Sequence, residues 1–172
     1  MPVASVIEAL NGEGPISKDW VLAWMDEPDI RTRGAVYELT RRAWSRITPE
    51  LSMQEQCSFM ADYLIECLLT DPDESEWGHS AFLAGYEIAA WLKHLHGIPG
   101  TSLIIGAVAQ ELTHGYRQAD TSTRNGIETF CLEHIFENRS LRTFFTHWRE
   151  DPELNEAYKF CADWGDAHSD YG

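Results

Sequence analysis

Two pairs of residues have the spacing of a metal-ligand motif. Glu111 and His114 lie three residues apart in the stretch ELTHGY. Glu76 and His79 repeat the same spacing in the stretch EWGH. Four-helix proteins hold pairs of iron or manganese ions with two such Glu-x-x-His pairs, whose side chains all point into the bundle. The chemistry that this pattern suggests is that of a metal-dependent helical enzyme.

The helical position of each pair argues against this chemistry. At about 100° per residue, Glu111 and His114 fall on the polar side of their helix, away from its apolar stripe. That stripe contains Ile105, Val108, Leu112 and Tyr116. Glu76 follows Asp73 at the spacing of a capping box, in which the Glu binds a free backbone N–H. We therefore expect no metal and no other cofactor, and keep the four residues as an alternative reading.

Other catalytic patterns are weak or missing. The sequence contains no GxSxG, GxxxxGK[ST], GxGxxG or HExxH motif. Cys131 and His134 share one helical turn, but their apolar neighbours favour a packed thiol over a reactive one. The four cysteines show no CxxC spacing, so we expect buried free thiols in a reducing compartment. These observations predict a protein without catalytic activity.

The charge of the chain restricts its partners. It has 28 Asp and Glu against 13 Lys and Arg, a formal charge of −15. Such a balance argues against nucleic acid or an anionic membrane as the main partner. Five arginines lie within residues 31–46, and residues 47–92 contain no Lys or Arg. We expect Arg41, Arg42 and Arg46 to pair with acids of the following helix, among them Glu50, Glu55, Asp62 and Glu66.

The last third of the chain combines acids with aromatic side chains. Residues 150–172 contain seven acids and only one basic residue, Lys159. Aromatic anchors within an acidic rim are typical of a protein that binds a basic partner tightly. The predicted partner-binding residues are Asp151, Glu153, Glu156, Phe160, Asp163, Trp164, Asp166 and Asp170.

The chain has seven tryptophans, which divide into two groups by their neighbours. Five lie on apolar helix faces and are expected in the core: Trp20, Trp24, Trp44, Trp77 and Trp91. Trp148 and Trp164 lie among carboxylates and are expected at the partner surface.

Helices must position all of these residues. Apolar residues recur at spacings of three and four, and Pro, Gly and capping residues occupy the breaks. A short opening helix is expected to end near residues 11 and 12, and further helices are expected near residues 17–25, 29–47, 52–68, 73–95, 101–116, 122–137, 140–148 and 152–164. No segment alternates convincingly as a strand. The pattern predicts an all-α single domain over residues 1–172, with eight or nine antiparallel helices in a compact bundle or in HEAT-like stacked hairpins. Residues 165–172 are expected to form a mobile acidic tail.

Three functional classes fit these features. The first is a non-catalytic module that neutralises a basic protein partner, as an immunity protein or antitoxin neutralises a toxin. The second is a general helical adaptor or scaffold, and the third is the metal-dependent helical enzyme. The sequence shows neither a membrane-spanning stretch nor a secretory signal, which favours a cytoplasmic protein with no membrane partner.

Overall fold

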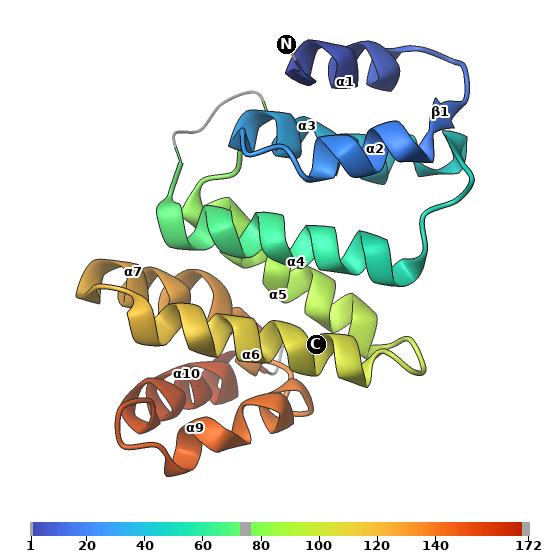
Figure 1. Cartoon of the computed structure of the whole chain (residues 1–172). Coiled ribbons are helices and arrows are strands. Elements are labelled where there is room, and N and C mark those ends of the chain that lie inside the picture. Colours follow the sequence, from blue (N-terminus) through green and yellow to red (C-terminus); the bar gives the residue numbers. More distant parts are fainter. Residues whose placement is uncertain (1, 73–76, 170–172) are drawn as a thin grey trace. The chain divides into compact units, whose positions relative to one another are not determined.

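The computed structural model describes residues 2–72 and 77–169, and this part of the chain is all-α, as predicted (Figure 1). Its α-helices are α1 (Pro2–Asn11), α2 (Lys18–Met25), α3 (Ile30–Arg42), α4 (Met53–Thr70), α5 (Ala81–His96), α6 (Ser102–Gln118), α7 (Thr121–Gly126), α8 (Glu133–Phe136), α9 (Thr146–Glu150) and α10 (Asn155–His168). Short 3-10 helices cover Trp44–Arg46 and Leu141–Phe145, and a π-helix covers Ile127–Leu132.

The chain divides into two compact units. Unit 1 contains residues 1–63 and 72–80, and unit 2 contains residues 64–71 and 81–172. The boundary falls within α4, so this helix contributes residues to both units. The single-domain organisation stays a prediction. In the described residues, no helix combines the length and the apolar character that crossing a bilayer requires.

Unit 1 is organised around α3, against which α1 and α2 pack. Unit 1 also contains two short parallel strands, which were not predicted from the sequence. Strand β1 (Ile16–Ser17) pairs with β2 (Ile47–Thr48), and Ile16 lies opposite Ile47. Both isoleucines are buried. Only two residues of each strand pair, which is too short for an alternating pattern to stand out.

Local capping interactions explain where several helices begin. A capping box begins α4, because Ser52 N donates to Glu55 Oε2 at 2.7 Å and Glu55 N donates to Ser52 Oγ at 3.1 Å. The carboxylate of Asp29 accepts hydrogen bonds from Arg31 N and Thr32 N at the start of α3. Local capping therefore fixes the starts of α3 and α4.

Two predicted helices are too long. The helix expected over residues 29–47 ends at Arg42, because Ala43 leaves the helical region with a φ of −130°. The helix expected from residue 73 begins at Ala81, whose backbone N–H donates to the carboxylate of Asp71 at 2.7 Å. Residues 73–76, including the proposed cap at Glu76, lie outside the described residues.

The expected pairing with an acid is wrong for Arg46. Arg46 donates to the backbone carbonyls of Ala9, Leu10 and Gly14 instead of to an acid. Glu55 binds Lys18 Nζ at 2.7 Å instead of an arginine. Arg46 therefore stabilises the carboxyl end of α1, where free helix carbonyls need donors.

The burial of several tryptophan side chains differs from the prediction. Trp148 was expected at the surface but is completely buried, whereas Trp20 and Trp44 were expected in the core but are 63% and 56% exposed. Trp91 is buried as predicted. All four cysteines are buried and free, as predicted.

In unit 2, α7, the π-helix and α8 follow one another without a break from residue 121 to residue 136. The predicted helix over residues 122–137 is confirmed, but its π-helical segment was not foreseen. Buried residues of this continuous helix include Ile127, Leu132 and Phe136. Helices α6, α9 and α10, labelled in Figure 1, belong to the same unit. Helix α10 continues through His168, so the first four residues of the expected mobile tail are helical.

Candidate protein-binding surface

Six ring side chains of unit 2 form a continuous series of contacts, which we call the aromatic strip: Phe130, Phe82, Tyr86, His134, Trp164 and His168. In that order, successive ring centroids lie 5.5, 4.9, 4.2, 5.0 and 3.9 Å apart. The rings come from three parts of the fold, namely α5, the helix over residues 121–136, and α10.

Helical spacing places these rings in pairs. Phe82 and Tyr86 are four residues apart on α5, and Trp164 and His168 are four residues apart on α10. Residues at this spacing lie on the same face of an α-helix. The two helices thus each contribute one pair of neighbouring rings.

Two glycines allow α5 and α10 to pack closely against the helix over residues 121–136. A Cβ atom at Gly85 would lie 2.6 Å from the carbonyl oxygen of Phe130, and one at Gly165 would lie 2.6 Å from that of Phe136. No side chain larger than hydrogen fits at these distances. Tyr86 follows the first glycine and Trp164 precedes the second, and their rings both contact His134.

The imidazole of His134 is held by a carboxylate as well as by the rings. Its Nδ1 lies 3.0 Å from Oε1 of Glu137, whose other oxygen pairs with Lys93 Nζ. Burial alone would raise the pKa of Glu137, but the hydrogen bonds from Lys93 and His134 lower it below its ordinary value. Glu137 is therefore ionised at neutral pH and orients His134 through Nδ1.

Glu133 lies beside this group as a buried carboxyl, with 7% of its surface exposed. Desolvation raises the pKa of Glu133, although the nearby His134 and His168 oppose the rise. Its neighbours Cys131 and Cys161 are buried, and desolvation raises the pKa of both thiols. Neither cysteine supplies a thiolate, so this cluster resembles a packed support more than a nucleophilic site.

The outer part of the surface is aromatic and acidic. Phe82, Tyr86 and Phe160 are 49%, 44% and 51% exposed. Phe160 lies one helical turn before Trp164, and Glu156 and Asp163 share its side of α10. Both acids are exposed and make no ion pair with another described residue. This arrangement is an aromatic surface with free carboxylates at one edge.

The structure separates the predicted partner-binding residues into two groups. Glu156, Phe160, Asp163 and Trp164 lie on or beside this surface, whereas three other acids bind arginines of the same unit. Asp151 pairs with Arg117. Glu153 lies 2.8 Å from Arg124, and Asp166 lies 2.9 Å from Arg142. The last contact lowers the pKa of Asp166. Asp170 lies outside the described residues.

Phe82, Tyr86 and His134 belong to the surface but were not predicted as site residues. Their sequence signal is modest, since FLAGY shows only two rings four residues apart beside a glycine. A ring pair at that spacing occurs equally on a buried helix face. The contacts that link this pair to α10 through His134 span about 80 residues of sequence.

The alternative metal ligands have other environments. His79 Nδ1 lies 2.8 Å from the hydroxyl of Tyr63, and its ring contacts Tyr37 edge-on at 4.9 Å. Glu111 and His114 are exposed on α6. Across residues 2–72 and 77–169, no group of three or more His, Cys, Asp or Glu side chains has an arrangement that could hold a metal ion.

Comparisons with protein-family models, with curated proteins and with solved structures find no significant match to this chain. The surface itself is therefore the basis for an inference about function.

Proposed function

We propose that this chain is a non-catalytic protein-binding module that binds a basic partner through the aromatic strip and the adjoining side of α10. The observation that carries the proposal is the continuous series of ring contacts across three parts of the fold, with Phe82 and Tyr86 exposed on α5 and Phe160 exposed on α10. Contiguous exposed aromatic surface is costly in water and is typical of interfaces, where Tyr, Trp and Phe provide most of the binding energy.

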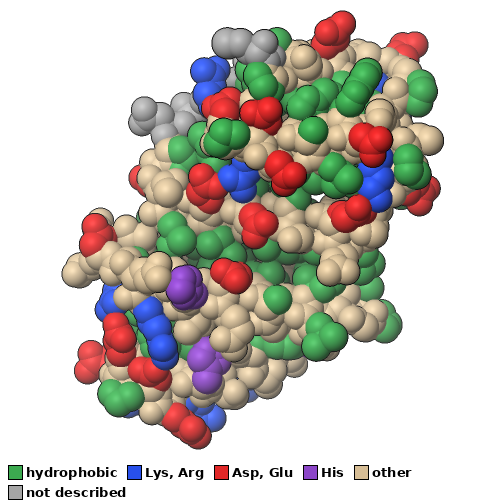
Figure 2. All heavy atoms as spheres, in the orientation of Figure 1, with side chains coloured by type: hydrophobic (Ala, Val, Ile, Leu, Met, Phe, Trp, Pro, Cys, Tyr) green, Lys and Arg blue, Asp and Glu red, His purple; other side chains and the backbone are tan. Residues whose placement is uncertain are grey.

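The charge of unit 2 supports a basic partner. The unit has 15 Asp and Glu against seven Lys and Arg, a formal charge of −8. Several of its cations already pair internally, including Arg117, Arg124 and Arg142. On the face drawn in Figure 2, acidic side chains outnumber basic ones. Carboxylates such as Glu156 and Asp163 would speed the approach of a cationic surface.

The narrower form of the proposal is a neutraliser, of the immunity-protein or antitoxin type, acting in the cytoplasm. Ring stacking, the Glu137 hydrogen bond and two glycine contacts hold the rings of the aromatic strip in place. A pre-organised surface loses little conformational entropy on binding and therefore favours high affinity. The general adaptor differs only in its partner, so inhibition of a toxic activity distinguishes the two.

Site-specific photo-crosslinking in the native cell tests the proposal. A benzophenone amino acid would replace Phe160, and the matched control would carry it at Leu103, which is 88% exposed on α6 of the same unit. We expect position 160, and not position 103, to capture a partner with excess Lys and Arg. The purified pair should then associate more slowly as the salt concentration rises.

Three results would count against the proposal. One is crosslinking that is equal at both positions, and another is an acidic partner. The third is an affinity for the purified partner that Trp164→Ala and Phe160→Ala leave unchanged. A partner whose enzymatic or toxic activity falls at one equivalent of this protein would support the neutraliser over the adaptor.

A further inference from the structure

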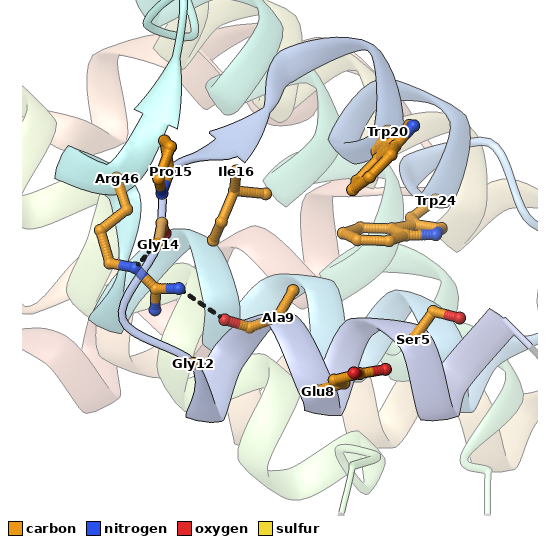
Figure 3. Close-up of a pocket in the computed structure, with 10 residues that line it drawn as sticks. All are labelled: Ser5, Glu8, Ala9, Gly12, Gly14, Pro15, Ile16, Trp20, Trp24 and Arg46. Atoms are coloured by element: carbon orange, nitrogen blue, oxygen red, sulfur yellow. Dashed lines mark hydrogen bonds between the residues drawn. The ribbon is translucent and has the colours of Figure 1, made fainter.

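A separate groove lies in unit 1, between α1 and α2 (Figure 3). Its volume is about 660 Å³, and the loop from Gly12 to Ile16 closes one side. We call it the indole groove, after the side chains of Trp20 and Trp24 that line it. None of its residues belongs to the aromatic strip, so it can be considered independently of the function proposed above.

The two indoles form the wall on α2. They are four residues apart, their ring centroids lie 6.4 Å apart, and their planes are inclined by 46°. Figure 3 shows both rings projecting towards α1, where Ser5 and Glu8 lie at the same end of the groove. Trp20 is largely exposed, so one indole face remains open to a ligand. The groove thus combines aromatic faces with a carboxylate.

Arg46 lies at the opposite end, where its hydrogen bonds are used internally. Its Nη2 donates to Ala9 O at 2.8 Å, its Nε to Gly14 O at 3.0 Å, and its Nη1 to Leu10 O at 3.3 Å. These carbonyls belong to the carboxyl end of α1 and to the loop after it. The negative end of a helix dipole offsets part of the guanidinium charge. Arg46 is thus a structural group whose hydrogen bonds go to backbone carbonyls, and it makes no ion pair with Glu8 in the described part of the chain.

The segment that contains α1 and α2 is acidic, although the cation of Arg46 also lines the groove. Residues 2–27 contain five acids, Glu8, Glu13, Asp19, Asp26 and Glu27, and a single basic residue, Lys18. Lys18 pairs with Glu55. Glu8 and Glu13 are exposed and make no ion pair with another residue in the described part of the chain. A cation entering the groove would therefore meet negative charge and indole faces together.

We propose that the indole groove binds an arginine side chain of another polypeptide, with the guanidinium between the indoles and the carboxylate of Glu8. The planar guanidinium stacks on aromatic faces, is weakly hydrated, and can donate two parallel hydrogen bonds to a carboxylate. An indole is the best aromatic partner for a cation. This site is a second binding function of the chain, in addition to the aromatic strip.

NMR titration of the intact protein with acetyl-Gly-Arg-Gly-amide tests the site. The matched probe is the same peptide with citrulline, which keeps the shape of arginine and removes its charge. We expect the indole N–H signals of Trp20 and Trp24 to move, with a Kd on the order of 1–10 mM for the arginine peptide. The signal of Trp44, which is exposed but does not line the groove, should stay in place.

Two variants identify the carboxylate that is responsible. Glu8→Gln should weaken binding about fivefold, the usual scale for one partly exposed charge contact. Glu13→Gln is the control, since Glu13 is exposed nearby but does not line the groove. It should leave the affinity within about twofold. Spectra of both variants before titration show whether they remain folded, and about 0.5 M salt should weaken binding to the wild-type protein.

Several results would overturn the proposal. Equal binding of the citrulline peptide would show an apolar groove instead of a cation site. Movement of the same signals with inorganic phosphate, and not with the arginine peptide, would assign the groove to an anion. If the indole N–H signals of Trp20 and Trp24 stay in place at about 50 mM arginine peptide, the groove does not bind arginine with the expected affinity. Equal affinities of the Glu8→Gln variant and the wild-type protein would remove the carboxylate from the site.

Discussion

The indole Nε1 of Trp148 donates a hydrogen bond to Oγ1 of Thr113 across 2.8 Å in the interior of unit 2. The same hydroxyl donates to the carbonyl of Ala109 at 2.7 Å and lies 3.0 Å from Nε2 of His147. Because a hydroxyl has one proton to donate, His147 must be the donor in its contact with Thr113. One threonine thus satisfies the polar atoms of two rings from α9.

Thr113→Val should destabilise the protein by about 1–3 kcal/mol, since it leaves the buried indole N–H of Trp148 without an acceptor. Chemical denaturation measures the change. The control is Thr129→Val, because the hydroxyl of Thr129 donates to the carbonyl of Asn125 within the same helix. Its cost should stay below about 1 kcal/mol. Equal losses in both variants would mean that the Trp148 contact contributes nothing beyond the usual effect of the substitution.

Gly85→Ala should destabilise unit 2 by about 1–3 kcal/mol, because the added methyl group overlaps the backbone of Phe130. Gly106→Ala is the matched control, since its nearest neighbour would be Phe144 Cδ1 at 3.9 Å. On α6 this control should stabilise the protein by up to about 1 kcal/mol through helix propensity. Thermal unfolding of the two variants should therefore shift in opposite directions. A stabilised Gly85→Ala variant would contradict the close helix crossing.

Glu133→Gln should make the protein more stable at pH 7. The folded state raises the pKa of Glu133, so stability from this group is complete below the unfolded pKa and declines as pH rises through the folded pKa. Removing the charge should raise the free energy of unfolding by roughly 0.5–1 kcal/mol at pH 7, and the difference should shrink by about pH 4. Urea denaturation at both values measures it. Glu111→Gln, on the exposed side of α6, is the control for the substitution itself and should change stability at pH 7 by less than about 0.5 kcal/mol.

The carboxyl of Glu55 should titrate far below ordinary glutamates. The hydrogen bond from Lys18 and those from Ser52 lower the pKa of Glu55 to about 2. Its contribution to stability is therefore present above the unfolded pKa and is lost as pH falls through about 2. Carbon-detected NMR gives the midpoint directly. Lys18→Met should move it upwards, and Lys18→Arg should retain most of the depression; equal midpoints in the wild-type protein and the Lys18→Met variant would contradict the assignment.

Features encoded within a few residues were predictable from sequence. The capping box of Ser52 and Glu55 needs only one helical turn, and the Asp29 cap needs only the backbone that follows it. The exposure of tryptophans was not predictable in this way. Trp148 is buried because Thr113, 35 residues earlier, offers an acceptor. Trp20 and Trp24 share a helix face, but their neighbours on α1 leave a groove beside them.

The candidate surface was predictable only in part. The ring of Trp164 and the acids around it stand out within one helix of the sequence. The internal pairing of Asp166 depends on Arg139 and Arg142, which approach it only in the folded unit. The same holds for Tyr86, which reaches Trp164 through His134. Spacing along one helix cannot show which acids remain free once other helices have packed against it.

The π-helical segment Ile127–Leu132 lies in the helix that carries Phe130 and His134. A π-turn closes its hydrogen bond one residue wider than an α-turn, so the segment takes up about one residue more than a regular helix with the same rotation. Deleting one residue there would return the segment to α geometry and leave the residues after it facing nearly the same way. His134 would then keep its contacts with Tyr86 and Trp164. The same deletion in a regular helix would turn everything after it by about 100°. The aromatic surface therefore tolerates a change of chain length at this point that a regular helix would not.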